Sequence, residues 1–513
     1  MPETVRDLLR PHAPDAPAIG APDRPWLTYG ALNALADDTM ARLNTLGIGR
    51  RDLVAIVLPN GPEMAAAFVT LAGCCDTAPL NPAYKVDEHA FYLEDLRARL
   101  LVVAEGDEGP AVAAARRLGL RIARLAIPPD APAGQFTLSP EDAGTTAPTD
   151  RPGPSGPDDA ALVLHTSGTT SRPKIVPLLN RNVAASADHI GRVLRLTPDD
   201  RCLNIMPLFH IHGLIAAVTA SLAHGASVWC SPGFNALQVF HWMEAAAPTW
   251  YTAVPTMHQA ILTRAPRNAD ILARRRLRLI RSSSASLPPQ VMAALEETFG
   301  CPVIESYGMT EAAHQMTSNP LPPAARKAGS VGIPAGPAVR IADESADRLL
   351  GPDATGEVVI SGPNVTPGYE ANAAANDAAF FVLDGQRWFR TGDQGRFDAE
   401  GYLRITGRLK EIINRGGEKI SPLEVDDALM DHPAVQQVVT FGMPHPKLGE
   451  DVAAAVVARD GQTVTEAELR AFAAERLADF KVPRRILVLD EIPKGATGKL
   501  QRIGLAAKLG VGA

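Results

Sequence analysis

The hydrophobic pattern in the first third of the chain switches repeatedly between helical and strand periods. Thr28 stands as the N-cap of an apolar-periodic helix that stops at Gly47, and residues 52–58 (DLVAIVL) form a continuous apolar run typical of a buried strand. A helix over 62–75, a short strand over 77–80, another helix and the strand RLLVVAE follow. Because strands that alternate with helices pair in parallel, this pattern predicts a doubly wound α/β sheet.

The rest of the chain falls into further regions. Residues from about 127 to 159 are rich in Pro, Gly, Asp and Thr, which predicts a long surface connection. A second αβ region runs from the strand ALVLHT to about residue 340, and short strands with Gly/Pro turns follow it. The last part alternates again, with helices expected from Ser421 and Thr465, which predicts a separate small α+β domain.

Composition narrows the class of protein. A chain of 513 residues exceeds one ordinary hydrophobic core, and 46% apolar with 21% charged residues excludes a disordered chain. The net charge of -7 argues against a nucleic-acid partner. Five cysteines without CxxC spacing, and an N-terminus without a signal layout, favour a reducing, cytoplasmic location. No charged residue occurs between Arg201 and Glu244, but the His, Asn, Gly and Pro there favour a buried interior over an integral membrane segment.

The run TSGTTSRPK directly follows the strand ALVLH and has the composition of an anion-binding loop. Hydroxyls and small residues let backbone N–H groups close around phosphate oxygens, while a lysine neutralises their charge. Its spacing differs from that of a Walker A loop, and a Ser/Thr-rich surface turn is the other interpretation. The candidate ATP-binding residues of this loop are Thr166, Ser167, Gly168, Thr169, Thr170 and Lys174.

Four later motifs follow in order: YGMTE, TGD, GRLKE and PKGATGK. Together with the loop, they resemble the adenylate-forming acyl-CoA synthetases, which activate a carboxylate with ATP to an acyl-AMP and then transfer the acyl group to a thiol. The resemblance implies ATP, Mg²⁺ and coenzyme A as the small molecules bound. It also implies a large N-terminal domain over 1–408, built of doubly wound αβ subdomains plus a β-rich subdomain. A small mobile α+β lid over 409–513 would rotate about the hinge residue Lys410.

The resemblance also assigns roles to single residues. Lys499 matches the catalytic lysine, Thr310 and Glu311 match contacts to the α-phosphate and Mg²⁺, and Tyr307 matches the surface against adenine. Asp393 would hold the ribose hydroxyls beside Arg408, because a carboxylate accepts two O–H donors; a turn-forming Asp after Gly392 is the alternative. Further candidates are Ala285, Glu305 and Ser306 for the adenylate, and Gly416, Gly417 and Lys419 for CoA, where an ordinary hairpin turn is the alternative.

Two positions depart from the family pattern. Relatives commonly have Gly where this chain has Ser171 and Ile175. A β-branched Ile175 requires ordinary strand dihedrals directly after Lys174.

The acid-binding residues are predicted from a polar pocket. His210 and His212 lie in PLFHIHG, Ser284 in RSSSASL, and His314 three residues after Glu311, on the same face if that segment is a helical turn. Histidines and serines that converge suit a short, polar or dianionic acid, because His donates hydrogen bonds or carries charge near neutral pH. Taken singly, each histidine is better explained as a satisfied core residue or as a gate at the phosphates. His210 is also a candidate catalytic residue.

Whole segments, including HTSGTTSRPK, PLFHIHGL, SSSASL and INRGGEKISPLEVD, resemble the oxalate–CoA ligases within the superfamily. The resemblance implies that oxalate, ATP and CoA give oxalyl-CoA, AMP and diphosphate. Malonate or a medium-chain fatty acid as the substrate, a carrier-protein thiol as the acceptor, and a non-catalytic nucleotide-binding protein stay open. The expected assembly is a monomer or homodimer.

Overall fold

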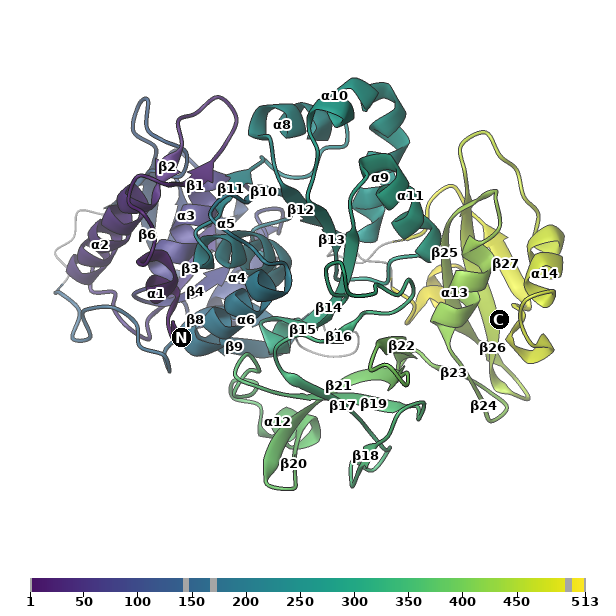
Figure 1. Ribbon diagram of the computed structural model, residues 1–513. Helices are drawn as coiled ribbons and strands as arrows, with labels where there is room; N and C mark the ends of the chain where they lie inside the picture. The colour runs from purple at the N-terminus through teal and green to yellow at the C-terminus, as the bar shows by residue number, and fades with distance from the viewer. Residues whose placement is uncertain (1, 142–146, 167–172, 494–500, 512–513) are drawn as a thin grey trace. The chain divides into compact units, whose positions relative to one another are not determined.

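The computed structural model describes residues 2–141, 147–166, 173–493 and 501–511 (Figure 1). The chain divides into two compact units. Of the described residues, the first unit contains those within 2–166, 173–339 and 360–378, and the second those within 340–359 and 379–511. The mixed α/β class predicted from the hydrophobic pattern is confirmed, whereas the domain boundary at 408/409 stays a prediction.

A seven-stranded sheet in the first unit has the order β7-β6-β5-β3-β4-β8-β9. Strands β6, β5, β3, β4 and β8 pair in parallel, and the edge strands β7 and β9 pair antiparallel. The strands are β3 (Leu53–Val57), β4 (Asp76–Pro79), β5 (Leu100–Ala104), β6 (Arg121–Ala126), β7 (Thr137–Pro140), β8 (Ala160–His165) and β9 (Ile175–Leu179). Strand β7 lies within the segment from 127 to 159, for which the sequence predicts a surface connection and no strand.

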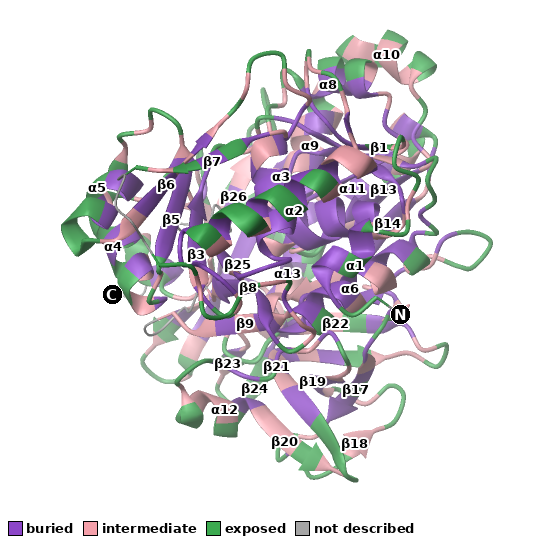
Figure 2. Ribbon diagram, turned by 90° about the vertical axis from the view of Figure 1, so that its left-hand side faces the viewer, coloured by how far each residue is buried: buried purple, intermediate pink, exposed green. Residues whose placement is uncertain are grey.

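The first long helix of this region begins at the capping residue that the sequence predicts. The Thr28 side chain accepts a hydrogen bond from the N–H of Ala31 and so caps α2. Figure 2 shows the strands β3 and β5 as buried, whereas α2 turns an exposed face to solvent. The helices are α1 (Val5–Leu9), α2 (Tyr29–Thr45), α3 (Pro62–Leu71), α4 (Val86–Asp95) and α5 (Pro110–Leu118).

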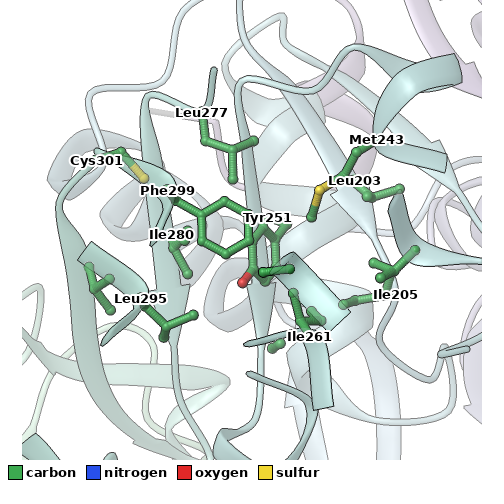
Figure 3. Packing of buried hydrophobic residues seen from close by; sticks show 14 of the residues in the cluster. Leu203, Ile205, Met243, Tyr251, Ile261, Leu277, Ile280, Leu295, Phe299 and Cys301 are labelled. Atoms are coloured by element: carbon green, nitrogen blue, oxygen red, sulfur yellow. The ribbon is translucent and has the colours of Figure 1, made fainter. Parts of the chain in front are cut away.

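A nine-stranded sheet in the same unit has the order β16-β15-β14-β13-β12-β10-β11-β1-β2. Its strands from β14 to β1 pair in parallel. One face of the strands packs on an apolar cluster that includes Tyr251, Ile280 and Phe299 (Figure 3). The strands are β1 (Pro17–Gly20), β2 (Leu27–Thr28), β10 (Arg201–Asn204), β11 (Ser227–Cys230), β12 (Trp250–Ala253), β13 (Leu279–Ser282), β14 (Val303–Met309), β15 (His314–Ser318) and β16 (Ile333–Pro334).

Helices fill the space between these two sheets. Helix α3 contacts β4 and β11, and α6 contacts β8 and β15, so each touches strands of both sheets. The π-helix η1 lies in the charge-free stretch, is buried throughout and contacts β10, β12 and β15. The helical elements are α6 (Asn180–Val193), η1 (His212–Thr219), α7 (Ala220–Ala223), α8 (Val239–Ala246), α9 (Pro255–Arg264), η2 (Ala265–Asn268), α10 (Ala269–Arg274), α11 (Pro289–Phe299), η3 (Thr310–Ala312) and α12 (Ala373–Ala379). Among the described residues, no helix combines the length and apolar character that crossing a membrane requires.

The second unit contains the β-rich region and the C-terminal α+β region. The first forms a sheet of order β18-β17-β19-β21-β20 with β22 on β21; the second forms β24-β23-β26-β25 with β27 on β26. Ser421 and Thr465 cap α13 and α14, which confirms both expected helix starts. The elements are β17 (Ala338–Ala342), β18 (Leu349–Leu350), β19 (Gly356–Ser361), β20 (Phe380–Leu383), β21 (Gln386–Phe397), β22 (Leu403–Arg408), β23 (Ile413–Arg415), β24 (Glu418–Ile420), α13 (Pro422–Met430), β25 (Val435–His445), β26 (Gly449–Ala458), α14 (Glu466–Ala474), η4 (Asp479–Lys481), β27 (Arg485–Val488) and α15 (Leu505–Lys508).

Candidate active site

The predicted phosphate loop connects two paired strands. His165 at the end of β8 pairs with Ile175 at the start of β9, and the N–H of Thr166 donates to the carbonyl of Lys174 over 2.9 Å. Ile175 is the first residue of β9, which confirms the strand dihedrals expected for it. The pairing fixes both ends of the loop. The predicted contacts Ser167, Gly168, Thr169 and Thr170 lie outside the described residues, and their roles stay predictions.

Tyr369 joins the lysine of this loop to the candidate metal ligand. The Lys174 Nζ lies 4.3 Å from the centroid of the Tyr369 ring, and the Tyr369 hydroxyl donates to Glu311 Oε1 over 2.9 Å. Burial, and then the Glu311 carboxylate beside it, raise the pKa of Tyr369, so its hydroxyl stays a donor at neutral pH. Tyr369 could not be predicted as a site residue, because its only local signal in the sequence is the turn-like PGYE.

The adenine motif also supports the loop that follows β13. Glu305 is buried on β14, and its Oε1 accepts from the N–H of Leu287 over 2.8 Å. The Ser283 hydroxyl donates to the carbonyl of Ser306 over 2.9 Å. Glu305 and Ser306 therefore hold the loop that carries Ser284 and Ala285 against β14. Of the remaining predicted contacts, Ala285 is exposed, whereas Tyr307 and Thr310 are half-buried.

Three of the four predicted acid-binding residues lie together. His212 is the first residue of η1, and its Nδ1 lies 3.0 Å from Ser284 Oγ. The rings of His212 and His314 are 5.1 Å apart between centroids. His210 instead lies half-buried in the preceding turn, with its ring 4.7 Å from that of Phe209. The geometry thus favours His212 over His210 as the histidine that accompanies Ser284 and His314.

His314 reaches this cluster by a different route from the one expected. A helical turn from Glu311 to His314 is wrong, because η3 ends at Ala312 and His314 begins β15. Ala313 takes a left-handed conformation with φ 47°, which reverses the chain. The backbone at Ser284 (φ 72°) and His314 (φ 103°) is also in the region that favours glycine.

Two further residues complete the polar cluster. Thr252 Oγ1 lies 2.6 Å from His212 Nε2, and Arg281 Nη2 lies 3.4 Å from His314 Nδ1. Thr252 and Arg281 are both fully buried. Neither residue was predicted from the sequence, although an arginine inside the apolar strand LRLIRS is a signal that could have identified Arg281.

The predicted ribose contacts pair on adjacent strands of the second unit. Asp393 on β21 is opposite Arg408 on β22, and Arg408 Nε lies 3.1 Å from Asp393 Oδ1. Asp393 is buried while Arg408 is largely exposed. Asp393 lies within a strand, so the alternative of a turn-forming Asp is wrong. A carboxylate that pairs with a cation on one oxygen can accept hydroxyl donors on its remaining lone pairs.

The predicted hinge and CoA residues lie in two turns. Lys410 is exposed in the turn after β22. Gly416 (φ 61°) and Gly417 (φ 100°) form the hairpin between β23 and β24, with Lys419 exposed on β24. The hairpin alternative for the glycines is therefore the observed geometry. Both turns leave the predicted roles untested.

Arg502 anchors the chain that follows the predicted catalytic lysine. Its Nη2 lies 2.6 Å from Asp426 Oδ2, and its Nε lies 3.5 Å from Glu411 Oε2. Burial raises the pKa of both carboxyl groups, and the Arg502 charge opposes that shift in each. Arg502 thus fixes this segment beside the turn that contains Lys410. Lys499 itself lies outside the described residues.

Comparison with known proteins identifies the family. The model of the AMP-binding enzyme family matches residues 10–370, and that of the AMP-binding enzyme C-terminal domain matches residues 424–499. The oxalate–CoA ligase of Arabidopsis thaliana is 44% identical over 98% of this chain and 97% of its own length. The oxalate–CoA ligase of Saccharomyces cerevisiae is 42% identical (88% and 86%), and the sulfoacetate–CoA ligase of Cupriavidus necator 37% identical (96% and 94%).

Solved structures agree with the sequence comparison. ATP-bound MatB from Rhodopseudomonas palustris superposes with a TM-score of 0.86, at 28% identity over 99% of both chains. The anthranilate CoA ligase AuaEII in complex with anthranoyl-AMP gives a TM-score of 0.85, at 26% identity over 99% of this chain and 98% of its own. With family models that match most of its length and relatives this similar along nearly all of it, the chain belongs to the AMP-binding enzyme family.

Proposed function

We propose that this protein is an acid–thiol ligase that uses ATP to join oxalate to coenzyme A. The choice of oxalate as the substrate rests on the cluster of His212, Ser284 and His314. Hydrogen-bonding groups stand there in place of the apolar lining that an alkyl chain needs. Two relatives carry the name oxalate–CoA ligase. Sulfoacetate, named in a third, likewise has a second anionic group beside its carboxylate.

The reaction has two steps in this proposal. One oxalate carboxylate attacks the α-phosphorus of ATP, so that an acyl–phosphate bond forms and diphosphate leaves. The CoA thiol then attacks the acyl carbon, and AMP leaves. Both steps bring anions together, which requires local cations and donors. Lys174 serves the phosphates, Lys499 the reacting oxygens, and Asp393 with Arg408 the ribose.

The division of labour between the two steps rests on a moving lid. We place the large domain at 1–408 and the lid at 409–513, with rotation about Lys410. Its exposed position in a turn supports this role, because a hinge needs a few residues that can change φ and ψ without breaking a core. Gly416, Gly417 and Lys419 then receive CoA in the rotated arrangement.

Glu311 fits a magnesium ion that is shared with ATP. Mg²⁺ in nucleotide enzymes is usually held by one or two carboxylates, with phosphates and waters completing its shell. Glu311 supplies one carboxylate, which Tyr369 orients, and the described residues contain no cluster of three metal-ligating side chains. When bound, the ion neutralises phosphate charge as diphosphate departs.

An acid panel tests the proposal. Diphosphate exchange into ATP, and CoA-ester formation followed by mass spectrometry, would be measured with oxalate, malonate, sulfoacetate and octanoate. We expect oxalate to have the highest kcat/KM in both assays. Faster reaction with octanoate or malonate would reassign the substrate. ATP binding without any CoA ester would favour a non-catalytic role, and exchange without CoA-ester formation would point to a carrier-protein thiol.

Location and assembly are separate parts of the proposal. We place the protein in the cytoplasm, as a monomer or homodimer. All five cysteines are buried thiols, which agrees with a reducing compartment. Light scattering on a size-exclusion column decides the assembly, and a larger oligomer would contradict it.

A further inference from the structure

Arg281 is a buried cation surrounded by neutral groups. Its side chain has no solvent exposure and lies on β13, between β12 and β14. Nη1 lies 3.5 Å from Thr252 Oγ1, and Nη2 lies 3.4 Å from His314 Nδ1 and 3.3 Å from Gln315 Oε1. Burial lowers the pKa of Arg281 to about 9, which still leaves the guanidinium charged at neutral pH.

The missing partner is a carboxylate. Among the residues that the structure describes, none offers a carboxylate within ion-pair distance of Arg281, and its Nε has no acceptor. Arg278, three residues earlier, shows the usual arrangement, because its Nε lies 2.9 Å from Asp200 Oδ1. A buried charge without a counter-charge is strongly unfavourable, and the described residues around Arg281 leave its charge for a bound anion to balance.

The alternation of side chains along β12 and β13 places the Arg281 side chain on the face that meets the predicted acid-binding residues His212 and His314. Tyr251 and Ile280 are neighbours across β12 and β13, and both enter the apolar cluster of Figure 3. Thr252 and Arg281 are the next pair in the same register, so their side chains project from the opposite face. That face meets His212 on η1 and His314 on β15.

Arg281 also fixes the direction of the hydrogen bonds, because a guanidinium only donates. Thr252 Oγ1 accepts from Arg281, and its own proton is then available to His212 Nε2 at 2.6 Å. When Thr252 donates in this way, His212 carries its proton on Nδ1 and donates to Ser284 Oγ at 3.0 Å, which leaves the Ser284 hydroxyl to donate onward. In the other branch, His314 accepts at Nδ1 and keeps its proton on Nε2.

From this arrangement we infer that Arg281 is the buried counter-cation for the second anionic group of the substrate. It is a positioning residue: with no exposed surface, it acts through Thr252, His212 and Ser284 on one side and through His314 on the other. The first chain of hydrogen bonds ends in the Ser284 hydroxyl and the second in His314, and each end donates a hydrogen bond. Such a site selects an acid with two negative groups, which only accept. This inference rests on the proposed function and names the feature that makes a second carboxylate a requirement.

Oxamate provides the probe, because it has the shape of oxalate with one carboxylate replaced by a neutral amide. Diphosphate exchange would give kcat and KM for both acids with wild type, Arg281→Met and Arg281→Lys. The control is Arg276→Met, the same change at an exposed arginine in the segment that precedes β13. Purified variants would be compared by thermal unfolding.

Wild type should prefer oxalate over oxamate by about 100-fold in kcat/KM, the loss expected for a buried charge without its partner. Arg281→Met should lose most of this preference through a higher KM for oxalate, with oxamate nearly unchanged. Arg281→Lys keeps the positive charge but loses the planar set of guanidinium N–H donors. It should retain about a tenth or more of the wild-type preference for oxalate over oxamate in kcat/KM. Arg276→Met should match wild type.

Three results would overturn the inference. Arg281→Met that unfolds at a lower temperature but keeps the oxalate preference would make the arginine purely structural. A folded Arg281→Lys variant with equal kcat/KM for oxalate and oxamate would show that the positive charge does not cause the preference. This variant also provides the test if Arg281→Met does not fold. Wild type inactive with oxalate would refute the proposed function together with the inference, whereas an active wild type with an unaltered Arg281→Met ratio refutes only the inference.

Discussion

Tyr369 offers a graded test of how the phosphate loop and the candidate metal ligand are coupled. Its ring packs under Lys174 Nζ at 4.3 Å and its hydroxyl donates to Glu311 Oε1 at 2.9 Å. Tyr369→Phe removes only the hydrogen bond, whereas Tyr369→Leu also removes the aromatic face. The two variants therefore separate two contacts made by one side chain.

The magnitudes follow from the two contacts. A hydrogen bond to a charged group contributes about 1.5–3 kcal/mol, and tenfold in a rate or binding constant corresponds to about 1.4 kcal/mol. Tyr369→Phe should therefore lower kcat/KM for ATP about 10- to 150-fold. A cation–π contact adds about 0.5–2 kcal/mol, so Tyr369→Leu should lose about a further two- to thirtyfold.

The assay is diphosphate exchange into ATP at saturating oxalate, repeated over a range of magnesium concentrations. Because the hydroxyl orients Glu311, Tyr369→Phe should also raise the magnesium concentration needed for half-maximal rate. Tyr84→Phe is the matched control, since it removes a phenol hydroxyl from a half-buried tyrosine stacked on Tyr92. A folded Tyr369→Phe variant with wild-type kcat/KM and magnesium dependence would refute the coupling.

Three other perturbations have defined outcomes. Burial, with the charges of Asp159 and Glu370, raises the pKa of Asp76 from 3.8 to about 7. The folded state therefore binds this proton more tightly than the unfolded state does. The free energy of unfolding should fall as the pH is raised from about 4 to about 7. Asp76→Asn should remove that fall in thermal unfolding, and equal pH slopes in both proteins would contradict the assignment. Lys499→Ala should abolish adenylation but spare thioester formation from supplied oxalyl-AMP, and equal loss of both half-reactions would oppose its role. Lys410→Pro should leave at most one of the two half-reactions, adenylation or thioester formation, active. Full activity in both assays would contradict the hinge role of Lys410.

The fold could be predicted wherever local pattern decides it. Thr28, Ser421 and Thr465 are capping residues whose side chains bond within three residues, so sequence alone located those helix starts. Strand β7 was missed because it forms by pairing with β6, and its Pro- and Gly-rich surroundings resemble a loop. The turn at Ala313 was missed because its left-handed backbone is imposed by β15 pairing with β14.

The residues of the candidate site also differ in whether a local sequence pattern identifies them. Motif residues such as Asp393 and Arg408 were found because each lies in a short recognisable pattern, and strand register then paired them. Tyr369, Thr252 and Arg281 carry no such pattern. Tyr369 lies 58 residues from Glu311, and Thr252 lies 40 from His212, so only the packed sheets bring them together.

Two of the three predicted acid-binding residues that lie together, Ser284 and His314, have an unfavourable backbone conformation. Where the chain needs only a left-handed turn, as in the β23–β24 hairpin, it uses Gly416 and Gly417. Ser284 and His314 have similar φ angles but carry side chains, at a cost on the order of 1–3 kcal/mol each. Glycine would relieve that strain and would remove the two groups that surround His212. Arg281 adds an unpaired buried charge at the same place, and under the inference drawn above the second negative group of the acid would balance that charge.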